Sequence, residues 1–262
     1  MTQEEQRENG MDFQPFAGGR LGGAVHATAK SLVRLYAKLY HRMEVTGREN
    51  YPTDGPFLLA CNHASYLDPP LVGSTVPRRI AYLAKEELFR IPVFGRLLRA
   101  FGAFPIQRNI ADRTALRRCR EVLGKGDPLI VFPEGTRSTD GRMKDARPGV
   151  GMLAAQNSDV QIVPVRIEGS FAAWGPGKLL PRPVKIRIRV GKPFRISAPE
   201  SAEHLKKQLY REIGAKILAH IVNIDPSGQR LNEADSMETD GQTVISSETK
   251  ESPDNGAGNR TP

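Results

Sequence analysis

The hydrophobic and polar positions follow two different periods along the chain, which predicts strands and helices in alternation. Short apolar runs between turn residues predict strands, and apolar residues spaced three and four apart predict helices. The predicted strands are residues 56–61, 79–85, 102–108, 129–132, 161–167 and 184–190, and the predicted helices are 24–43, 69–76, 94–101, 111–125, 148–155 and 199–221. This order indicates an α/β fold in which helices flank a central mixed sheet.

The two ends of the chain lack this periodicity. Residues 1–23 are polar and rich in glycine, and we expect a flexible lead there. Residues 222–262 contain no aromatic residue and are dominated by small polar and acidic ones, so we expect a disordered acidic tail. Between them, the helix over 24–43 precedes a single domain over 44–221.

The helix over 24–43 is amphipathic and basic. Lys30, Arg34 and Lys38 follow one another at intervals of four residues, beside a broad apolar side. Such a helix either packs on the domain and shows its charges to water, or lies in a membrane interface. The pattern alone favours packing, because most amphipathic helices are ordinary surface helices.

The charge of the chain is unevenly distributed. The formal net charge is +9, but residues 222–262 hold eight acids and three bases, a net of −5, which leaves +14 for residues 1–221. A basic domain indicates an anionic partner: nucleic acid, anionic lipid or a phosphorylated metabolite. Two cysteines make neither a disulfide framework nor a metal cluster, which favours a reducing compartment. We predict neither a signal peptide nor a membrane-spanning helix.

A histidine and a carboxylate follow the first predicted strand. His63 comes after the apolar run 56–61, and Asp68 precedes two prolines that favour a new helix. Across such a turn the carboxylate can reach the imidazole and fix its tautomer, so that the imidazole takes a proton from an alcohol. The simpler interpretation is that Asp68 caps the helix and His63 is a core histidine.

Three further predicted strands also end in polar residues, namely Lys85, Arg108, and Glu134 with Arg137. If the sheet aligns these ends, cations gather around His63, and guanidinium groups bind phosphate well. The sequence contains no nucleophile elbow and no P-loop, and His63 lacks histidine partners at metal-ligand spacing, so we predict no metal site. The remaining chemistry is proton abstraction from a hydroxyl.

Four blocks of the sequence together resemble the motifs of the glycerolipid acyltransferases, and a linking segment, residues 84–95, resembles the bacterial 1-acylglycerol-3-phosphate acyltransferases of the PlsC family. The resemblance covers about residues 44–200. The blocks are Asn62-His63-x4-Asp68, Gly102-Ala103-Phe104-Pro105-Ile106-x-Arg108, Phe132-Pro133-Glu134-Gly135-Thr136-Arg137-Ser138 and Ile162-Val163-Pro164-Val165.

The resemblance implies an acyl transfer in which His63 deprotonates the free hydroxyl of a lysophosphatidic acid and Asp68 orients His63. The acyl donor would be acyl-CoA or acyl-carrier protein, with no cofactor. The resemblance also places Lys85 at the phosphate or the reacting oxyanion. Positions tied to acceptor binding fall on Arg108, Glu134, Gly135, Thr136 and Arg137. A carboxylate repels phosphate, so our hypothesis is that Glu134 positions Arg137 or accepts a glycerol hydroxyl.

An enzyme with a lipid acceptor must reach a bilayer, so the resemblance shifts our interpretation of the helix over 24–43 to membrane docking. We therefore expect a peripheral protein on the cytoplasmic face of the cell membrane, with no nucleic-acid partner. Three alternatives remain: an acyltransferase for another lysolipid or for glycerol-3-phosphate, a noncatalytic module that binds anionic lipid or nucleic acid, and hydrolysis of the thioester.

Overall fold

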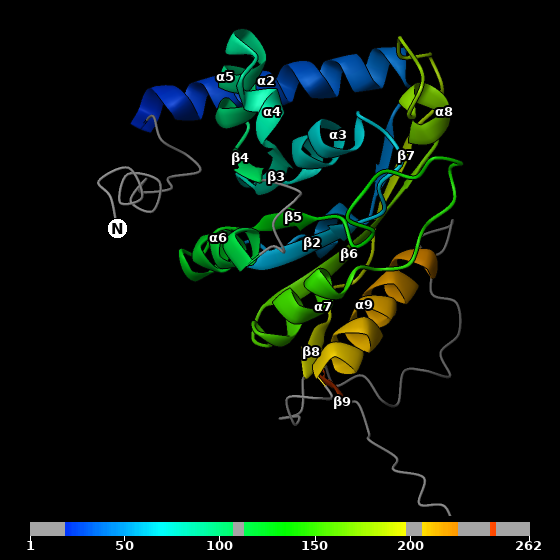
Figure 1. Ribbon diagram of the computed structural model, residues 1–262. Coiled ribbons are helices and arrows are strands. Elements are labelled where there is room, and N and C mark those ends of the chain that lie inside the picture. The colour runs from blue at the N-terminus through cyan, green and yellow to red at the C-terminus, as the bar shows by residue number, and fades with distance from the viewer. Residues whose placement is uncertain (1–18, 107–112, 198–205, 225–241, 245–262) are drawn as a thin grey trace, which may run out of the picture.

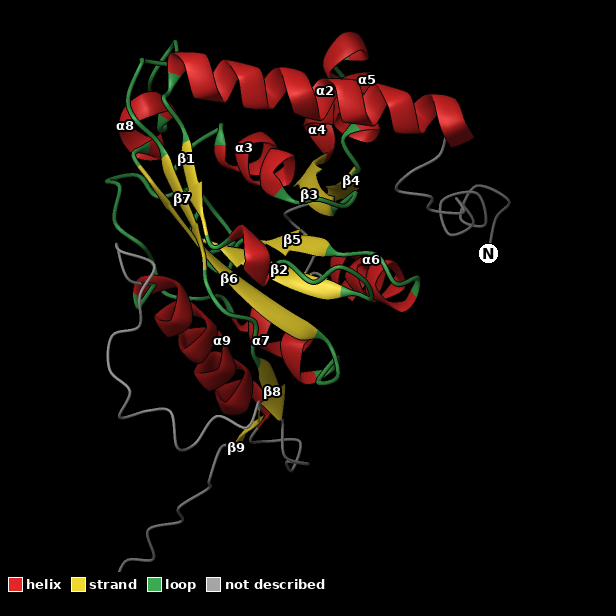
Figure 2. Ribbon diagram, turned by 180° about the vertical axis from the view of Figure 1, so that it is seen from behind, coloured by secondary structure: helices red, strands yellow, loops and turns green. Residues whose placement is uncertain are grey.

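The computed structural model describes residues 19–106, 113–197, 206–224 and 242–244. A seven-stranded sheet lies between two layers of helices (Figure 1), and Figure 2 shows the same layers from behind. The strands of this sheet are β1 (Glu44–Thr46), β2 (Phe57–Cys61), β3 (Ala81–Lys85), β4 (Ala103–Ile106), β5 (Leu129–Val131), β6 (Gln161–Glu168) and β7 (Arg187–Val190). The helices are α2 (Gly19–Tyr40), α3 (Asp68–Thr75), α4 (Glu86–Phe89), α5 (Pro92–Ala100), α6 (Arg113–Gly124), α7 (Pro148–Ala155), α8 (Ser170–Trp174) and α9 (Lys206–Val222), with a 3-10 turn at Arg48–Asn50.

Strand β2 lies at the centre of the sheet, whose order is β1-β7-β6-β2-β5-β3-β4. All its residues are buried because side chains of successive residues point to opposite faces and both faces are covered. Phe57, Leu59 and Cys61 join the core beneath α2 and α3. Leu58 and Ala60 join the core on the other face, against α6, α7 and α9.

The sheet is mixed, as predicted. Strands β6, β2, β5, β3 and β4 run parallel to one another, whereas β7 pairs antiparallel with β6 and β1 pairs parallel with β7. Because the five parallel strands end at one edge, the polar residues that follow β2, β5 and β3 share that edge. In open α/β sheets this edge is where ligand sites form.

Two residues of the basic row of α2, Lys30 and Arg34, face the protein, whereas Lys38 is exposed. The prediction that the charges of this row face water or a membrane is therefore wrong for Lys30 and Arg34. Lys30 Nζ donates to the carbonyls of Val76 and, at 3.1 Å, Arg78, and Arg34 Nε donates to the carbonyl of Ser74. The reason is that the last carbonyls of α3 lack helical partners, and these cations supply donors. Burial, and then the charge of Arg34, lower the pKa of Lys30 to about 8.

The opposite face of α2 exposes large apolar side chains. A surface helix normally turns its apolar side toward the protein, whereas α2 turns its apolar side toward solvent. Its exposed members, which we call the apolar stripe of α2, are Val25, Leu32, Leu35, Tyr36, Leu39 and Tyr40.

The predicted strands and helices are present, the helix over 148–155 with the predicted ends and several others with ends that differ by a few residues, and several short elements were missed. Residues 107–108, 111–112 and 199–205 of the predicted elements lie outside the described ranges. Helix α2 begins at Gly19 and so includes glycines that we assigned to the flexible lead. In the predicted tail, β9 (Gln242–Val244) pairs in parallel with β8 (Arg195–Ser197). The rest of residues 1–18 and 225–262 lies outside the described ranges. Every helix in the described part is too short or too polar to cross a bilayer.

Candidate active site

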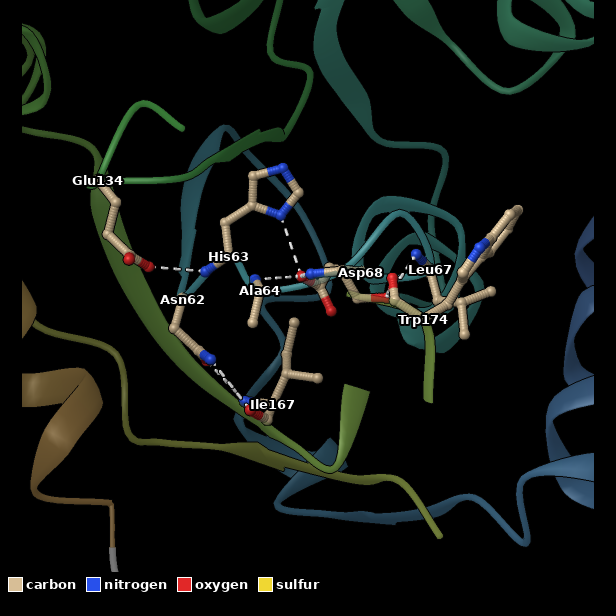
Figure 3. A network of polar contacts seen from close by, with 9 residues as sticks. Asn62, His63, Ala64, Leu67, Asp68, Glu134, Ile167 and Trp174 are labelled. Atoms are coloured by element: carbon tan, nitrogen blue, oxygen red, sulfur yellow. Dashed lines mark hydrogen bonds and ion pairs between the residues drawn. The ribbon is translucent and has the colours of Figure 1, made fainter. Parts of the chain in front are cut away.

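The end of β2 is fixed by Asn62, whose side chain replaces the sheet ladder where the strand stops. Its Nδ2 donates to the carbonyl of Ile167 at 3.0 Å, and its Oδ1 accepts the Ile167 amide at 2.7 Å. The amide group therefore pairs with the backbone of β6 as another strand residue would (Figure 3). This contact holds the chain in a defined direction just before His63.

His63 and Asp68 contact each other, as the sequence predicted from the turn between them. Nδ1 of His63 lies 3.0 Å from Oδ2 of Asp68, and the same oxygen accepts the amides of Ala64 and Ser65, both at 2.7 Å. Since an ionised carboxylate only accepts, the proton sits on Nδ1. Nε2 of His63 is left to accept a proton and points away from the network (Figure 3).

The carboxylate of Asp68 is completely buried in the first turn of α3. It does not cap that helix, because the amides it accepts belong to residues before the helix, and Leu67 occupies the N-cap position. The positive end of the helix dipole still favours the charge there. The simpler interpretation of Asp68 as a cap is therefore wrong, and its contacts serve the loop that carries His63.

The imidazole of His63 is held on its face as well as at its edge. Its ring stacks on Phe132 with the centroids 4.0 Å apart, and only 13% of the side chain is exposed. A flat apolar contact on one face and a hydrogen bond at Nδ1 leave little freedom to rotate. Nε2 is thereby aimed in one direction, which a general base needs.

Glu134 joins the loop after β5 to the loop after β2. Its Oε1 accepts the amide of His63 at 2.7 Å, and its Oε2 accepts the amide of Lys144 at 2.9 Å. The side chain is buried, which raises the pKa of Glu134, whereas the two amides oppose the shift. These contacts give Glu134 a role in positioning the backbone of His63, which our hypotheses about Arg137 and a glycerol hydroxyl did not include.

Arg137 lies across the ring of Tyr66, a residue of the turn between His63 and Asp68. The guanidinium carbon is 3.6 Å from the ring centroid, a cation–π contact. One of its nitrogens, Nη1, is buried without a hydrogen-bond partner among the described residues. The next residue, Ser138, donates its amide to the carbonyl of His63 at 2.8 Å. Arg137 therefore presents an unused donor beside the His63 loop.

Gly135 and Thr136 shape the turn that carries Arg137. Gly135 has a φ of +67°, where other residues are strained, and a Cβ on it would lie 3.0 Å from Arg147 Cγ. Its amide donates to the carbonyl of Phe132 at 2.9 Å, which closes the turn. Thr136 is half-buried. The backbone conformation at residue 135 thus favours glycine, whether or not Gly135 contacts a substrate.

Lys85 ends β3 at the same edge of the sheet, two strands away from β2. Its Nζ lies 3.7 Å from a carboxylate oxygen of Glu87, and both side chains are well exposed, so this pair holds the lysine weakly. Arg108 lies outside the described residues. The structure therefore brings together His63, Asp68, Glu134 and Arg137, and it places Lys85 on the shared edge.

Several residues of this site had no role in the sequence analysis. Asn62 and Tyr66 lie within the sequence block that contains His63 and Asp68, and this position was the feature of the sequence that could have indicated them. Trp174, the only tryptophan of the chain, accepts the hydroxyl of Ser65 at 2.8 Å and the amide of Tyr66 at 3.3 Å through its carbonyl. Backbone contacts of this kind leave no mark on side-chain patterns.

Comparisons with known proteins show which family the chain resembles. The family model described as Acyltransferase matches residues 42–168. The chain is 31% identical to the chloroplastic 1-acyl-sn-glycerol-3-phosphate acyltransferase LPAT1 of Arabidopsis thaliana, over 60% of this chain and 42% of the relative. It is 30% identical to the 1-acyl-sn-glycerol-3-phosphate acyltransferase of Bacillus subtilis, over 58% of this chain and 73% of the relative.

The fold is also found in a solved structure. The crystal structure of the 1-acyl-sn-glycerophosphate acyltransferase PlsC from Thermotoga maritima matches with a TM-score of 0.60 and 29% identity, over 82% of this chain and 86% of that one. The chain spans about half the length of most of the curated relatives it matches. Because the Bacillus subtilis relative is matched over most of its length, and PlsC shares the fold, the chain belongs to the glycerolipid acyltransferase family.

Proposed function

We propose that the protein transfers a fatty acyl group from acyl-CoA or acyl-carrier protein to the free hydroxyl of 1-acyl-sn-glycerol-3-phosphate, giving phosphatidic acid for phospholipid biosynthesis. The observation that carries the proposal is the 3.0 Å contact between Nδ1 of His63 and the buried Asp68, which leaves Nε2 as a base. The names of the relatives and of the PlsC structure support the choice of acceptor.

The reaction follows from the two nitrogens of His63. Nε2 takes the proton of the acceptor hydroxyl as its oxygen attacks the thioester carbonyl, and Asp68 stabilises the imidazolium that forms. When the tetrahedral intermediate collapses, the carbon–sulfur bond breaks and the leaving thiolate receives that proton. One carbon–oxygen bond has formed, one thiol has been released, and His63 returns to its starting state.

The acceptor phosphate is the part of the substrate that the cations recognise. Arg137 has a fixed orientation over Tyr66, and its Nη1 has no hydrogen-bond partner among the described residues, so its guanidinium can donate to the phosphate. Lys85 ends a strand at the same edge, and Arg108 follows the next strand in the sheet. In this proposal the three cations hold the phosphate while the glycerol hydroxyl meets Nε2 of His63.

Peripheral docking on the cytoplasmic face of the cell membrane is part of the proposal, because the acceptor and the product are lipids. The apolar stripe of α2 would lie in the interface, and Lys38 would meet anionic headgroups from an exposed position. The buried Lys30 contributes nothing to that contact. Release of the protein from membranes by high salt supports docking of this kind, whereas release by detergent alone contradicts it.

The experiment is a panel of substrates with purified protein. Acyl-CoA and acyl-carrier protein are each offered with lysophosphatidic acid, lysophosphatidylcholine and glycerol-3-phosphate, and the products are separated by chromatography. Phosphatidic acid as the dominant product supports the proposal. Transfer to another acceptor leaves the chemistry of His63 in place and replaces the substrate, and release of free fatty acid without transfer identifies a thioesterase.

A further inference from the structure

The segment after α8 exposes two consecutive leucines. Leu179 is 89% and Leu180 is 71% exposed, in a stretch that also contains Pro176, Pro181 and Pro183. Single exposed leucines are ordinary, but neighbouring large apolar side chains on a surface indicate a contact with something apolar. We call residues 175–183 the leucine loop.

The leucine loop has a fixed conformation. Nζ of Lys178 donates to the carbonyls of Phe171 at 2.7 Å and Ala172 at 2.6 Å, and so satisfies the end of α8. The indole of Trp174 donates to the carbonyl of Lys178 at 3.1 Å, and the amide of Arg182 donates to the carbonyl of Ala173 at 2.9 Å. Leu179 and Leu180 are therefore held outward by the backbone around them.

The loop is continuous with the apolar stripe of α2. The hydroxyl of Tyr40, the last residue of α2, donates to the carbonyl of Pro181 at 3.0 Å, and Arg42 donates to the carbonyl of Pro183 at 3.4 Å. Both ribbon views place α8 beside the C-terminal end of α2 (Figures 1 and 2). The two leucines thus extend a surface that already exposes Leu39 and Tyr40.

The charge of this surface selects one partner. Residues 19–43 and 169–183 contain no aspartate or glutamate, whereas Lys38, Arg42 and Arg182 are exposed. Apolar side chains bordered by cations match the headgroup and acyl boundary of an anionic bilayer. We propose that Leu179 and Leu180 insert into anionic phospholipid bilayers as a second anchor beside α2; the purpose of this anchor rests on the proposed function.

The second anchor is tied to the active site by hydrogen bonds. The carbonyl of Trp174, which precedes the loop, accepts the hydroxyl of Ser65 and the amide of Tyr66. The ring centroids of Trp174 and Tyr66 are 5.3 Å apart, and the ring of Tyr66 packs against the guanidinium of Arg137. Insertion of the leucines therefore sets the position of Arg137 relative to the headgroups from which an acceptor phosphate would come.

The test compares wild-type protein, the double variant L179S/L180S and the control V222S, which changes an exposed valine at the end of α9. Binding is measured by sedimentation with vesicles of phosphatidylcholine and phosphatidylglycerol in equal amounts. We expect the double variant to bind roughly 100-fold more weakly, about tenfold for each leucine removed from the interface. V222S should bind as wild type does, and all three proteins should unfold at the same urea concentration.

Vesicle binding needs no catalysis, so its failure is separate from failure of the proposed function. If wild type makes no phosphatidic acid from a short-chain, monomeric lysophosphatidic acid, the function falls while the anchor is still measured. The double variant should keep that activity and lose activity on acceptor embedded in vesicles. Equal vesicle binding by wild type and the double variant would overturn the anchor, as would a dimer of wild type that L179S/L180S dissociates without weaker vesicle binding.

Discussion

Replacing Glu134 with glutamine separates the positioning role seen in the structure from contact with the acceptor. The carboxylate offers one oxygen to the amide of His63 and the other to the amide of Lys144. Glutamine has a single acceptor oxygen, and its NH2 group faces an N–H donor. One buried amide therefore loses its partner, and the remaining hydrogen bond is no longer assisted by charge.

The magnitude combines a loss and a gain. A hydrogen bond to a charged group contributes about 1.5–3 kcal/mol, and a buried donor without a partner costs about 1–3 kcal/mol. Burial disfavours the ionised carboxylate, as the raised pKa of Glu134 indicates, so removing the charge offsets part of this loss. We expect a net destabilisation of about 2 kcal/mol, which lowers Tm by roughly 4–8 °C for a domain of this size.

The assay pairs urea unfolding with steady-state kinetics. The E134Q variant should lower kcat by about 10- to 100-fold and change KM for lysophosphatidic acid little. The reason is that Nε2 of a displaced His63 is no longer correctly placed to take the proton of the acceptor hydroxyl. The control is D140N, since Asp140 is an exposed carboxylate in the same loop that accepts the amide of Arg142 at 3.0 Å, and asparagine can do the same. An E134Q protein of wild-type stability with a raised KM alone would refute the reasoning.

Three further changes test other contacts of the structure. Asp68→Asn should lower kcat by about 10²–10⁴-fold, because the imidazolium of His63 loses its counter-charge; stopped-flow release of CoA measures it, and an unchanged kcat contradicts the pairing. Tyr66→Leu removes a cation–π contact and should raise KM for the acceptor by roughly 3- to 30-fold, while Tyr66→Phe stays near wild type. Burial lowers the pKa of Lys30 to about 8, so between that pH and the ordinary pKa of lysine the unfolded chain binds more protons than the folded chain, and the free energy of unfolding rises with pH. The urea midpoint of wild type should therefore rise relative to that of Lys30→Met between about pH 8 and 10. Midpoints of the two proteins that change in parallel would contradict this.

The sheet and the pair of His63 and Asp68 were predictable from the sequence, because both depend on local patterns. An apolar run of five buried residues identifies β2, and the prolines after Asp68 identify the start of α3. The spacing then leaves one turn across which the two side chains can meet. Their contact at 3.0 Å agrees with this reasoning.

The orientation of α2 and the role of Glu134 were not predictable in the same way. Periodicity groups Lys30 and Arg34 on one face, but only tertiary structure shows that the unpaired carbonyls of α3 lie opposite that face. Glu134 contacts backbone amides of distant residues, and every residue except proline carries an amide. Side-chain patterns therefore carry no record of such partners.

The most direct test of the account is the rate of acyl transfer by His63→Ala, with lysophosphatidic acid and acyl-CoA as substrates and circular dichroism as the check of folding. If Nε2 of His63 is the general base, kcat should fall by about 10²–10⁴-fold, with KM for either substrate little changed. A folded His63→Ala protein that keeps a rate within about tenfold of wild type would contradict the central claim, because proton abstraction would then belong to another group.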